Sequence, residues 1–179
     1  MIAARLVGKV VPASTREDEM ASIAQEAHLP ALGHHDREEV GRELQATLVE
    51  LVDLSLLGKQ LHWSVVGPLF KPLHEHLDEL VDSWRELGDT VAERAVALGF
   101  SPDGQAAAVS TGSNIPPVER GVLEAEVVVR ELVQRLADVT ERIRARMDRL
   151  GELDLASQDV LIEVTRGLEK QLWMIRSQL

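Results

Sequence analysis

Apolar residues recur every three or four positions along four long stretches of this chain, and that period predicts four amphipathic helices. The stretches cover about residues 36–65, 68–98, 118–150 and 155–179. Alternation of β-branched and polar residues, the sign of a half-buried strand, is scarce. Gly67-Pro68 predicts the turn after the first helix, while Gly99 and Gly151 are expected to end the second and third. The chain is therefore predicted to be all-α.

The connection between the second and third helices is long. It covers residues 99–117, opens on the turn sequence Ser101-Pro102-Asp103-Gly104, and closes on Pro116-Pro117. Its middle is expected to hold a short crossover element. Four long helices with one such connection predict a four-helix bundle of the ferritin-like kind. We expect this domain at residues 36–179, after an N-terminal extension at residues 1–35 with a short helix near 15–28.

The composition excludes several classes of protein and of metal site. The 179 residues suffice for one well-buried core, and the net charge of −11 with a pI near 5.0 attracts cations and repels nucleic acid. The absence of cysteine excludes disulfides and thiolate metal sites. No apolar run approaches the ~18 residues that span a membrane. Arg5 and Lys9 interrupt the first apolar stretch, which argues against a secretion signal and favours a cytoplasmic protein.

Five side chains in the predicted first and second helices are candidate metal ligands. They are His62, His74, Asp78, Asp89 and Glu93. His74 with Asp78, and Asp89 with Glu93, are spaced i, i+4, which puts each pair on one helix face one turn apart. Imidazoles and carboxylates form a nitrogen and oxygen ligand set that suits Fe(II). The five residues therefore predict an iron site.

The spacing excludes a single site in one chain. Asp78 and Asp89 are eleven residues apart, so on one helix they share a face but lie ~16 Å apart along its axis. One metal cannot bridge that distance, and the ligands divide into two half-sites. We call these the histidine half-site (His62, His74 and Asp78) and the acidic half-site (Asp89 and Glu93). A second copy laid antiparallel across a two-fold axis would complete both. The sequence predicts metal chemistry at a subunit interface.

The stretch from Lys59 to Gly99 resembles the Dps family of bacterial mini-ferritins. The residues that carry the resemblance are Lys59-Gln60-Leu61-His62-Trp63, Gly67-Pro68-Leu69-Phe70, Leu73-His74 with Asp78, and Asp89 with Ala92-Glu93-Arg94. Asp159-Val160-Leu161-Ile162, Leu168-Glu169-Lys170 and Trp173 are similar to the family's last helix. The resemblance covers roughly residues 36–179 and is most specific in its central motif.

The resemblance implies a hollow dodecamer with ferroxidase centres at its two-fold interfaces. The histidine half-site of one subunit would meet the acidic half-site of another. Lys59 would supply a charge next to the ligands, and Trp63 an oxidisable aromatic ring. Acidic pores admit iron in the family, and Asp154 and Asp159 best match the pore acids. Helix capping and charge–dipole pairing are an equal alternative for these two residues.

The sequence also separates this chain from bundles that hold two irons inside one subunit. Those bundles need the pattern Glu-x-x-His twice, and it occurs nowhere in this sequence. The predicted activity is oxidation of Fe(II), preferentially by hydrogen peroxide as the resemblance implies, with storage of a ferric mineral and suppression of hydroxyl-radical formation. Hydrolysis in the same pocket is the weakest alternative.

The main alternative is a nucleoid-associated protein that compacts DNA. The N-terminal extension offers four basic residues, Arg5, Lys9, Arg16 and Arg37, among several acidic ones. Phosphate binding needs several such contacts, which twelve tails on one particle could add together. Two further clusters stay open. His28, His34 and His35 form an accessory metal site or a solvated tail. Arg142, Arg144 and Arg146 are expected to be solvated or to pair between subunits.

Overall fold

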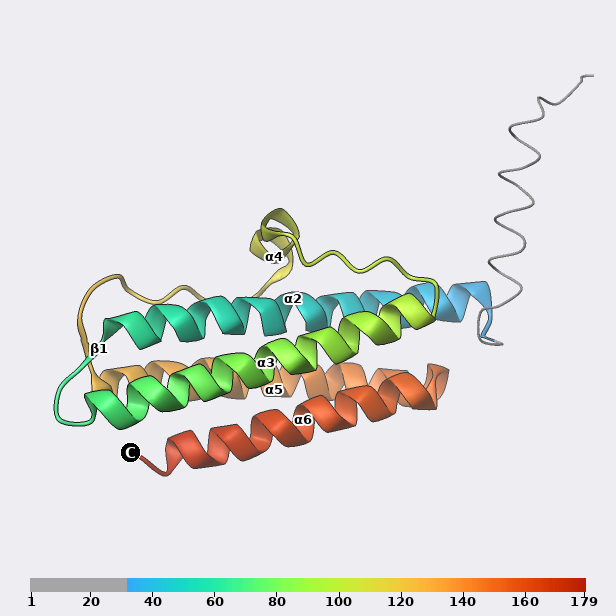
Figure 1. The fold of residues 1–179 in the computed structure, drawn as a ribbon. Helices are drawn as coiled ribbons and strands as arrows, with labels where there is room; N and C mark the ends of the chain where they lie inside the picture. The colour runs from blue at the N-terminus through green and yellow to red at the C-terminus, as the bar shows by residue number, and fades with distance from the viewer. Residues whose placement is uncertain (1–31) are drawn as a thin grey trace, which may run out of the picture. The chain divides into compact units, whose positions relative to one another are not determined.

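A computed structural model describes residues 32–179 of the chain. Its elements are α2 (His34–Ser64), β1 (Val65–Val66), α3 (Phe70–Ala97), α4 (Ala106–Gly112), β2 (Leu123–Glu124), α5 (Ala125–Leu153) and α6 (Leu155–Arg176) (Figure 1). The helix predicted near 15–28, His28 and all the basic residues considered for DNA except Arg37 lie outside the described residues. The proposed division at residues 35 and 36 stays a prediction.

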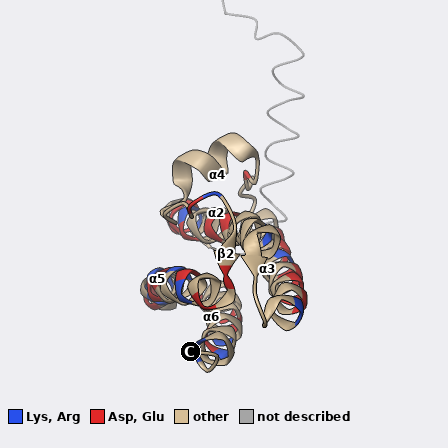
Figure 2. Cartoon of the chain, turned by 90° about the vertical axis from the view of Figure 1, so that its left-hand side faces the viewer, with Lys and Arg blue, Asp and Glu red and all other residues tan. Residues whose placement is uncertain are grey.

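The four long helices form a bundle made of two hairpins. Helices α2 and α3 form one hairpin, α5 and α6 form the other, and the end-on view shows all four in cross-section (Figures 1 and 2). Their apolar stripes meet in a core where Leu44, Leu54, Trp84, Leu136 and Leu161 have no solvent exposure. Burying each such leucine contributes about 1.5–3 kcal/mol. The prediction of an all-α, ferritin-like bundle is confirmed.

The long crossover contacts the bundle in its middle and near its C-terminal end. Helix α4 lies midway along it, as expected of a short crossover element, and packs on α2 (Figure 1). The crossover then runs back so that β2 pairs in parallel with β1, Val65 opposite Leu123 and Val66 opposite Glu124. Gly67, directly after β1, begins the turn to α3 with a φ of 102°, and a Cβ atom on it would lie 2.7 Å from Oε2 of Glu124. Only glycine fits this turn without strain.

Two predicted boundaries of the third helix are wrong. The helix begins at Ala125 and not at Val118, because the guanidinium of Arg135 donates hydrogen bonds to the carbonyls of Pro116 and Pro117 and holds that segment beside α5. Gly151 does not end it, since one glycine costs a helix only about 1 kcal/mol. The break falls at Asp154, whose φ is −154°.

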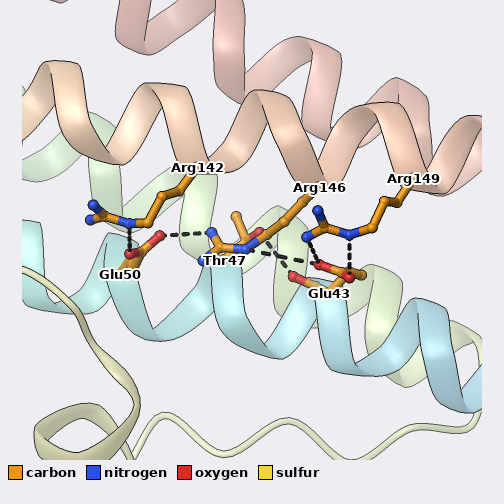
Figure 3. Close-up of polar contacts among 6 residues, drawn as sticks. All are labelled: Glu43, Thr47, Glu50, Arg142, Arg146 and Arg149. Atoms are coloured by element: carbon orange, nitrogen blue, oxygen red, sulfur yellow. Dashed lines mark hydrogen bonds and ion pairs between the residues drawn. The ribbon is translucent and has the colours of Figure 1, made fainter.

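The sequence predicts that Arg142, Arg144 and Arg146 are solvated or pair between subunits. Arg144 is exposed in an ion pair with Glu169, whereas Arg142 and Arg146 pair with Glu50 inside the bundle. Both oxygens of the fully buried Glu50 accept hydrogen bonds, from Arg142 Nε at 2.5 Å and Arg146 Nη1 at 2.7 Å (Figure 3). Glu43, two turns earlier on α2, accepts two bonds from Arg149. We call this group, Glu43, Glu50, Arg142, Arg146 and Arg149, the arginine ladder. It joins the two hairpins along the contact between α2 and α5.

The spacing carried a signal for the ladder. Glu43 and Glu50 are seven residues apart, as are Arg142 and Arg149, so each set lies on one face of its helix. Which two faces oppose one another depends on how the hairpins pack.

None of the helices within residues 32–179 has both the length and the apolar character needed to cross a membrane.

Candidate metal centre

The histidine half-site lies where the first hairpin reverses. His62 belongs to the last turn of α2 and His74 to the second turn of α3, and the short connection through Gly67 brings them together. Their rings stack, with centroids 3.5 Å apart and planes inclined by 25°. Nδ1 of His62 lies 3.0 Å from the carbonyl oxygen of His74, and Nδ1 of His74 lies 3.0 Å from the carbonyl oxygen of His62. Each imidazole is therefore oriented by the backbone of the other residue.

These reciprocal hydrogen bonds decide which ring nitrogen can bind a metal. A carbonyl oxygen only accepts hydrogen bonds, so each Nδ1 carries the proton. In a neutral imidazole the lone pair then belongs to Nε2. Histidines that ligate metals are commonly oriented in this way, with the second nitrogen donating to a carbonyl or carboxylate. The backbone contacts thus leave Nε2 as the nitrogen of each ring that could accept a metal.

Asp78, one turn after His74, completes this half-site. Its Oδ1 accepts a hydrogen bond from Lys59 Nζ at 2.6 Å and lies 3.2 Å from His62 Nδ1. The hydrogen bond from Lys59 holds the pKa of Asp78 below its ordinary value, and His62 and His74 add smaller effects in the same direction, while burial opposes them. The carboxylate is therefore ionised at neutral pH and fixed beside the imidazoles.

The two predicted neighbours also lie at this half-site. Lys59 reaches Asp78, and its Nζ lies 5.9 Å from the centroid of the Trp63 ring. Trp63 is 70% exposed, so its indole lies at the surface near Lys59 and not in the core.

The acidic half-site lies further along α3 and has a different character. Asp89 and Glu93 are both exposed, and neither forms an ion pair within residues 32–179. Asp89 borders an apolar depression of about 350 Å³, whose lining includes the 58%-exposed Leu56. No three His, Asp or Glu side chains in the described part of the chain form a group that could hold a metal ion. The structure therefore does not bring the five predicted ligands together within one chain.

The two candidate pore acids differ. Asp159 is exposed on α6. Asp154 caps α6, because its Oδ2 accepts hydrogen bonds from Ser157 N at 3.1 Å and Ser157 Oγ at 2.5 Å, and it also pairs with Arg94. Burial alone would raise the pKa of Asp154, but the hydrogen bonds from Ser157 and Arg94 outweigh it and lower the pKa below its ordinary value. Asp154 thus has the capping role that the sequence left open, and the pore role of both residues stays a prediction.

The other candidate histidine site lies at the start of α2, where the fold of residues 32–179 brings no further candidate metal ligand from another helix. His34 and His35 are exposed at the start of α2, and each lies beside a glutamate one turn on, at 3.7 Å from Glu38 and 3.8 Å from Glu39. An accessory metal site at these residues stays a prediction.

Comparison with known proteins identifies the family of this fold. The ferritin-like domain family matches residues 42–179. "DNA protection during starvation protein 2" of Deinococcus radiodurans is 34% identical over 149 residues, which cover 83% of this chain but 62% of that protein's length. The Dps structure of Mycobacterium smegmatis superimposes with a TM-score of 0.82 at 34% identity, covering 85% of this chain and 92% of the other.

A third similar structure is described as Dps from Microbacterium arborescens in the high iron form. Its TM-score is 0.78 at 31% identity, and the match covers 84% of this chain and 97% of that one. This chain belongs to the ferritin-like family and, within it, to the Dps proteins.

Proposed function

We propose that this protein oxidises Fe(II) at centres shared by two copies of the chain and stores the ferric product in a cage. Each centre combines the histidine half-site of one copy with the acidic half-site of the other. The observation that carries the proposal is the contrast between the half-sites. One is oriented by its own backbone and by Lys59, while the other is exposed and without an ion-pair partner in the described residues. The histidine half-site would supply the two imidazoles and one carboxylate, and the acidic half-site would supply two further carboxylates.

The geometry of α3 supports a second copy as the partner. Asp78 and Asp89 both belong to this helix and, at 1.5 Å per residue, are ~16 Å apart along it. A two-fold axis between them exchanges the half-sites of two antiparallel helices, so one contact completes two centres. The apolar depression beside Asp89, with exposed Leu56 at its rim, offers surface that such a contact would bury. Exposed apolar surface of this kind is typical of interaction sites.

The ligands suit iron as a substrate. Carboxylates bind Fe(II) and stabilise the harder Fe(III) product, whereas the two imidazoles add nitrogen ligands without charge. Lys59 keeps Asp78 ionised and oriented until a metal cation takes the place of the ammonium group. The net charge of −11 attracts cations to the surface. The iron named for the Microbacterium relative supports the same substrate.

The proposed reaction uses hydrogen peroxide as the oxidant. Each peroxide accepts one electron from each of two Fe(II) ions, its O–O bond breaks, and both oxygens leave as water or hydroxide. The Fe(III) ions hydrolyse, release protons and deposit as an oxyhydroxide mineral. Because both electrons reach the same peroxide, no hydroxyl radical is left over. This is the protective part of the proposed function.

The proposed assembly is a hollow dodecamer, as in the Dps family. Light scattering on the purified protein should give a particle mass of about twelve times the 19.8 kDa of one chain. A monomer that oxidises iron at full rate would contradict both the cage and the shared centre.

Complementation between two inactive variants tests the shared centre directly. His62→Ala/His74→Ala removes one half-site, and Asp89→Ala/Glu93→Ala removes the other. Each variant alone should lose rapid Fe(II) oxidation in a stopped-flow assay with peroxide. Cages assembled from equal amounts of both should regain about one quarter of the wild-type rate, because one centre in four then receives two intact half-sites.

The matched control is Glu79→Ala/Glu86→Ala, which removes two exposed carboxylates from the same helix outside both half-sites. It should oxidise iron at the wild-type rate. Mixed cages without any recovered activity would refute a centre built from two chains. Full activity in the Asp89→Ala/Glu93→Ala variant alone would refute the acidic half-site.

A further inference from the structure

Gly58, one residue before Lys59 in α2, lies where α3 packs tightly against α2. It is buried, and a Cβ atom on it would lie 2.6 Å from Cγ2 of Val81 and 2.6 Å from Cζ3 of Trp84. Ordinary van der Waals contacts of a Cβ atom begin at about 3.4 Å. Glycine is also among the least favourable residues inside a helix. Its presence here lets two side chains of α3 rest directly on the backbone of α2.

The two side chains opposite Gly58 are held in place. Val81 is 1% exposed, and a branched side chain of this kind has one strongly preferred rotamer in a helix. Trp84 has no solvent exposure, and its Nε1 donates to Oε1 of Gln171 in α6 at 2.7 Å. Nε2 of Gln171 in turn donates to Oγ of Ser83 at 2.9 Å. Because neither side chain moves freely, a methyl group at residue 58 would push α2 away from α3.

The histidine half-site depends on the spacing of the same two helices. Gly58 lies one turn before His62, and Val81 lies three residues after Asp78. Each imidazole of the half-site reaches the backbone carbonyl of the other histidine at 3.0 Å. Raising the 2.6 Å contact to 3.4 Å needs about 0.8 Å of movement, whereas a bond of 3.0 Å lengthens by only about 0.2 Å before it leaves the usual range. Such a movement would break both bonds.

Other residues of the hairpin do not impose this requirement. Leu61 and Leu77 are fully buried at the same end of the hairpin, but their side chains can change rotamer when the spacing of the helices changes. Gly58 has no rotamer to change. Gly88 of α3 also faces α2, yet a Cβ atom on it would lie 3.8 Å from its nearest neighbours there, at an ordinary distance. The close approach at Gly58 is therefore a local feature beside the histidine half-site.

We propose that Gly58 is a positioning residue for the metal centre. Its missing side chain, set against the anchored Trp84, gives α2 and α3 the spacing at which His62 and His74 orient one another. The inference rests on the proposed function of the two histidines as ligands. Gly58 touches neither the metal nor a ligand and acts only through the distance between the helices.

The variant that tests the inference is Gly58→Ala, studied in the assembled full-length protein. The probe is Co(II), which is not oxidised under anaerobic conditions and whose visible absorbance reports its coordination. We expect Co(II) affinity to fall about 10-fold, as is common when groups that orient metal ligands are lost. A crystal structure of the metal-free variant should show both ring-to-carbonyl distances beyond about 3.2 Å, which tests the spacing without any metal.

A rescue separates this role from general destabilisation. Adding Val81→Ala and Trp84→Leu to Gly58→Ala removes the atoms that the new methyl group would meet, so the helices can return to their original spacing. The triple variant should regain most of the Co(II) affinity. It should nevertheless be less stable than Gly58→Ala, because two core side chains have been truncated. Affinity and stability would then change in opposite directions.

The matched control is Gly41→Ala in the same helix. A Cβ atom on Gly41 would lie 2.2 Å from Cδ2 of Phe100, so the clash is at least as severe. Gly41 is ~30 Å from His62 along α2, at 1.5 Å per residue. This variant should lose stability but bind Co(II) like the wild type.

Wild-type Co(II) affinity in Gly58→Ala would overturn the inference, and so would a crystal structure in which only Val81 and Trp84 have moved. Equal losses of affinity in Gly41→Ala and Gly58→Ala would overturn it as well. If Gly58→Ala fails to assemble, the triple variant carries the same test: recovered binding supports the inference and absent binding overturns it. A Co(II) spectrum that survives both His62→Ala/His74→Ala and Asp89→Ala/Glu93→Ala would instead overturn the proposed function itself.

Discussion

Two pairs of acidic residues in the same helical hairpin have opposite surroundings. Glu43 and Glu50 of α2 face α5, where three arginines bind both carboxylates (Figure 3). Asp89 and Glu93 of α3 face away from the bundle and have no ion-pair partner in the described part of the chain. The first pair is neutralised by the fold, whereas the second remains available to a cation.

Physical cost explains the difference. Removing a carboxylate from water costs several kcal/mol unless cations and hydrogen bonds compensate, so Glu50 is tolerable only with its arginines. An exposed like-charge pair at i, i+4 costs roughly 0.2–0.5 kcal/mol, which a stable bundle can carry. The acids that the chain leaves unpaired are therefore the better candidates for binding a metal.

The largest expected effect belongs to the arginine ladder. Glu50→Ala removes a carboxylate that has no solvent exposure and that accepts hydrogen bonds from Arg142 and Arg146. The Arg142 side chain is 30% exposed, and the buried Arg146 keeps only Glu43, at 4.0 Å. We expect a loss of about 3–5 kcal/mol in the free energy of unfolding, as for one removed partner of a buried ion pair. Urea unfolding at one fixed protein concentration measures it, because assembly makes stability depend on concentration.

The control for Glu50 is Glu169→Gln, whose ion pair with Arg144 is largely exposed. Such pairs are worth at most about 1 kcal/mol. If Glu50→Ala costs no more than this control, the ladder is not what joins the hairpins.

A smaller effect is expected at Asp154, and it depends on pH. Because the pKa of Asp154 in the folded protein lies below its ordinary 3.8, its ionised form stabilises the fold above that value. This stabilisation is lost as the pH falls through the lower folded-state pKa. Asp154→Asn should cost about 1 kcal/mol at pH 7, and the difference from wild type should shrink below about pH 4. Urea midpoints measured from pH 7 to acid would test this. A difference that stays constant with pH would show that the charge of Asp154 does not contribute.

The smallest expected effect on stability is the most informative about function. Asp89→Asn/Glu93→Gln should stabilise the fold by roughly 0.2–0.5 kcal/mol, because it removes an i, i+4 repulsion. The same variant should lose rapid Fe(II) oxidation in the peroxide assay. A loss of stability above about 1 kcal/mol would mean that these carboxylates support the fold, as Glu43 and Glu50 do, and that the comparison does not hold.

Much of the fold could be predicted from the sequence, because the periodicity of apolar residues in a helix is a local signal. The stripes that end in Leu61, Leu98, Leu150 and Leu179 located all four long helices. The errors fell where a distant contact overrides local preference. Arg135 holds Pro116 and Pro117 in an extended segment, and the cap at Asp154, not Gly151, ends α5.

For the candidate metal centre, too, some features could be predicted from the sequence and others could not. Spacing alone put His74 with Asp78 and Asp89 with Glu93, and it kept the two pairs too far apart for one metal. It could not show that His62 and His74 orient one another through backbone carbonyls, or that Lys59 binds Asp78. Those contacts join α2 to α3 across a turn, and their geometry depends on how the two helices pack.

The sequence by itself determined the four long helices, and from the fixed rise of a helix per residue it predicted candidate metal ligands that two chains would have to share. Only the tertiary structure decided which acids are neutralised within the chain, which nitrogen of each imidazole is left for a metal, and that Arg94 is anchored to Asp154. The reason is that burial and hydrogen-bond partners depend on how helices pack together. The hydrophobic periodicity of one helix predicts its apolar face but not the residues that this face will contact.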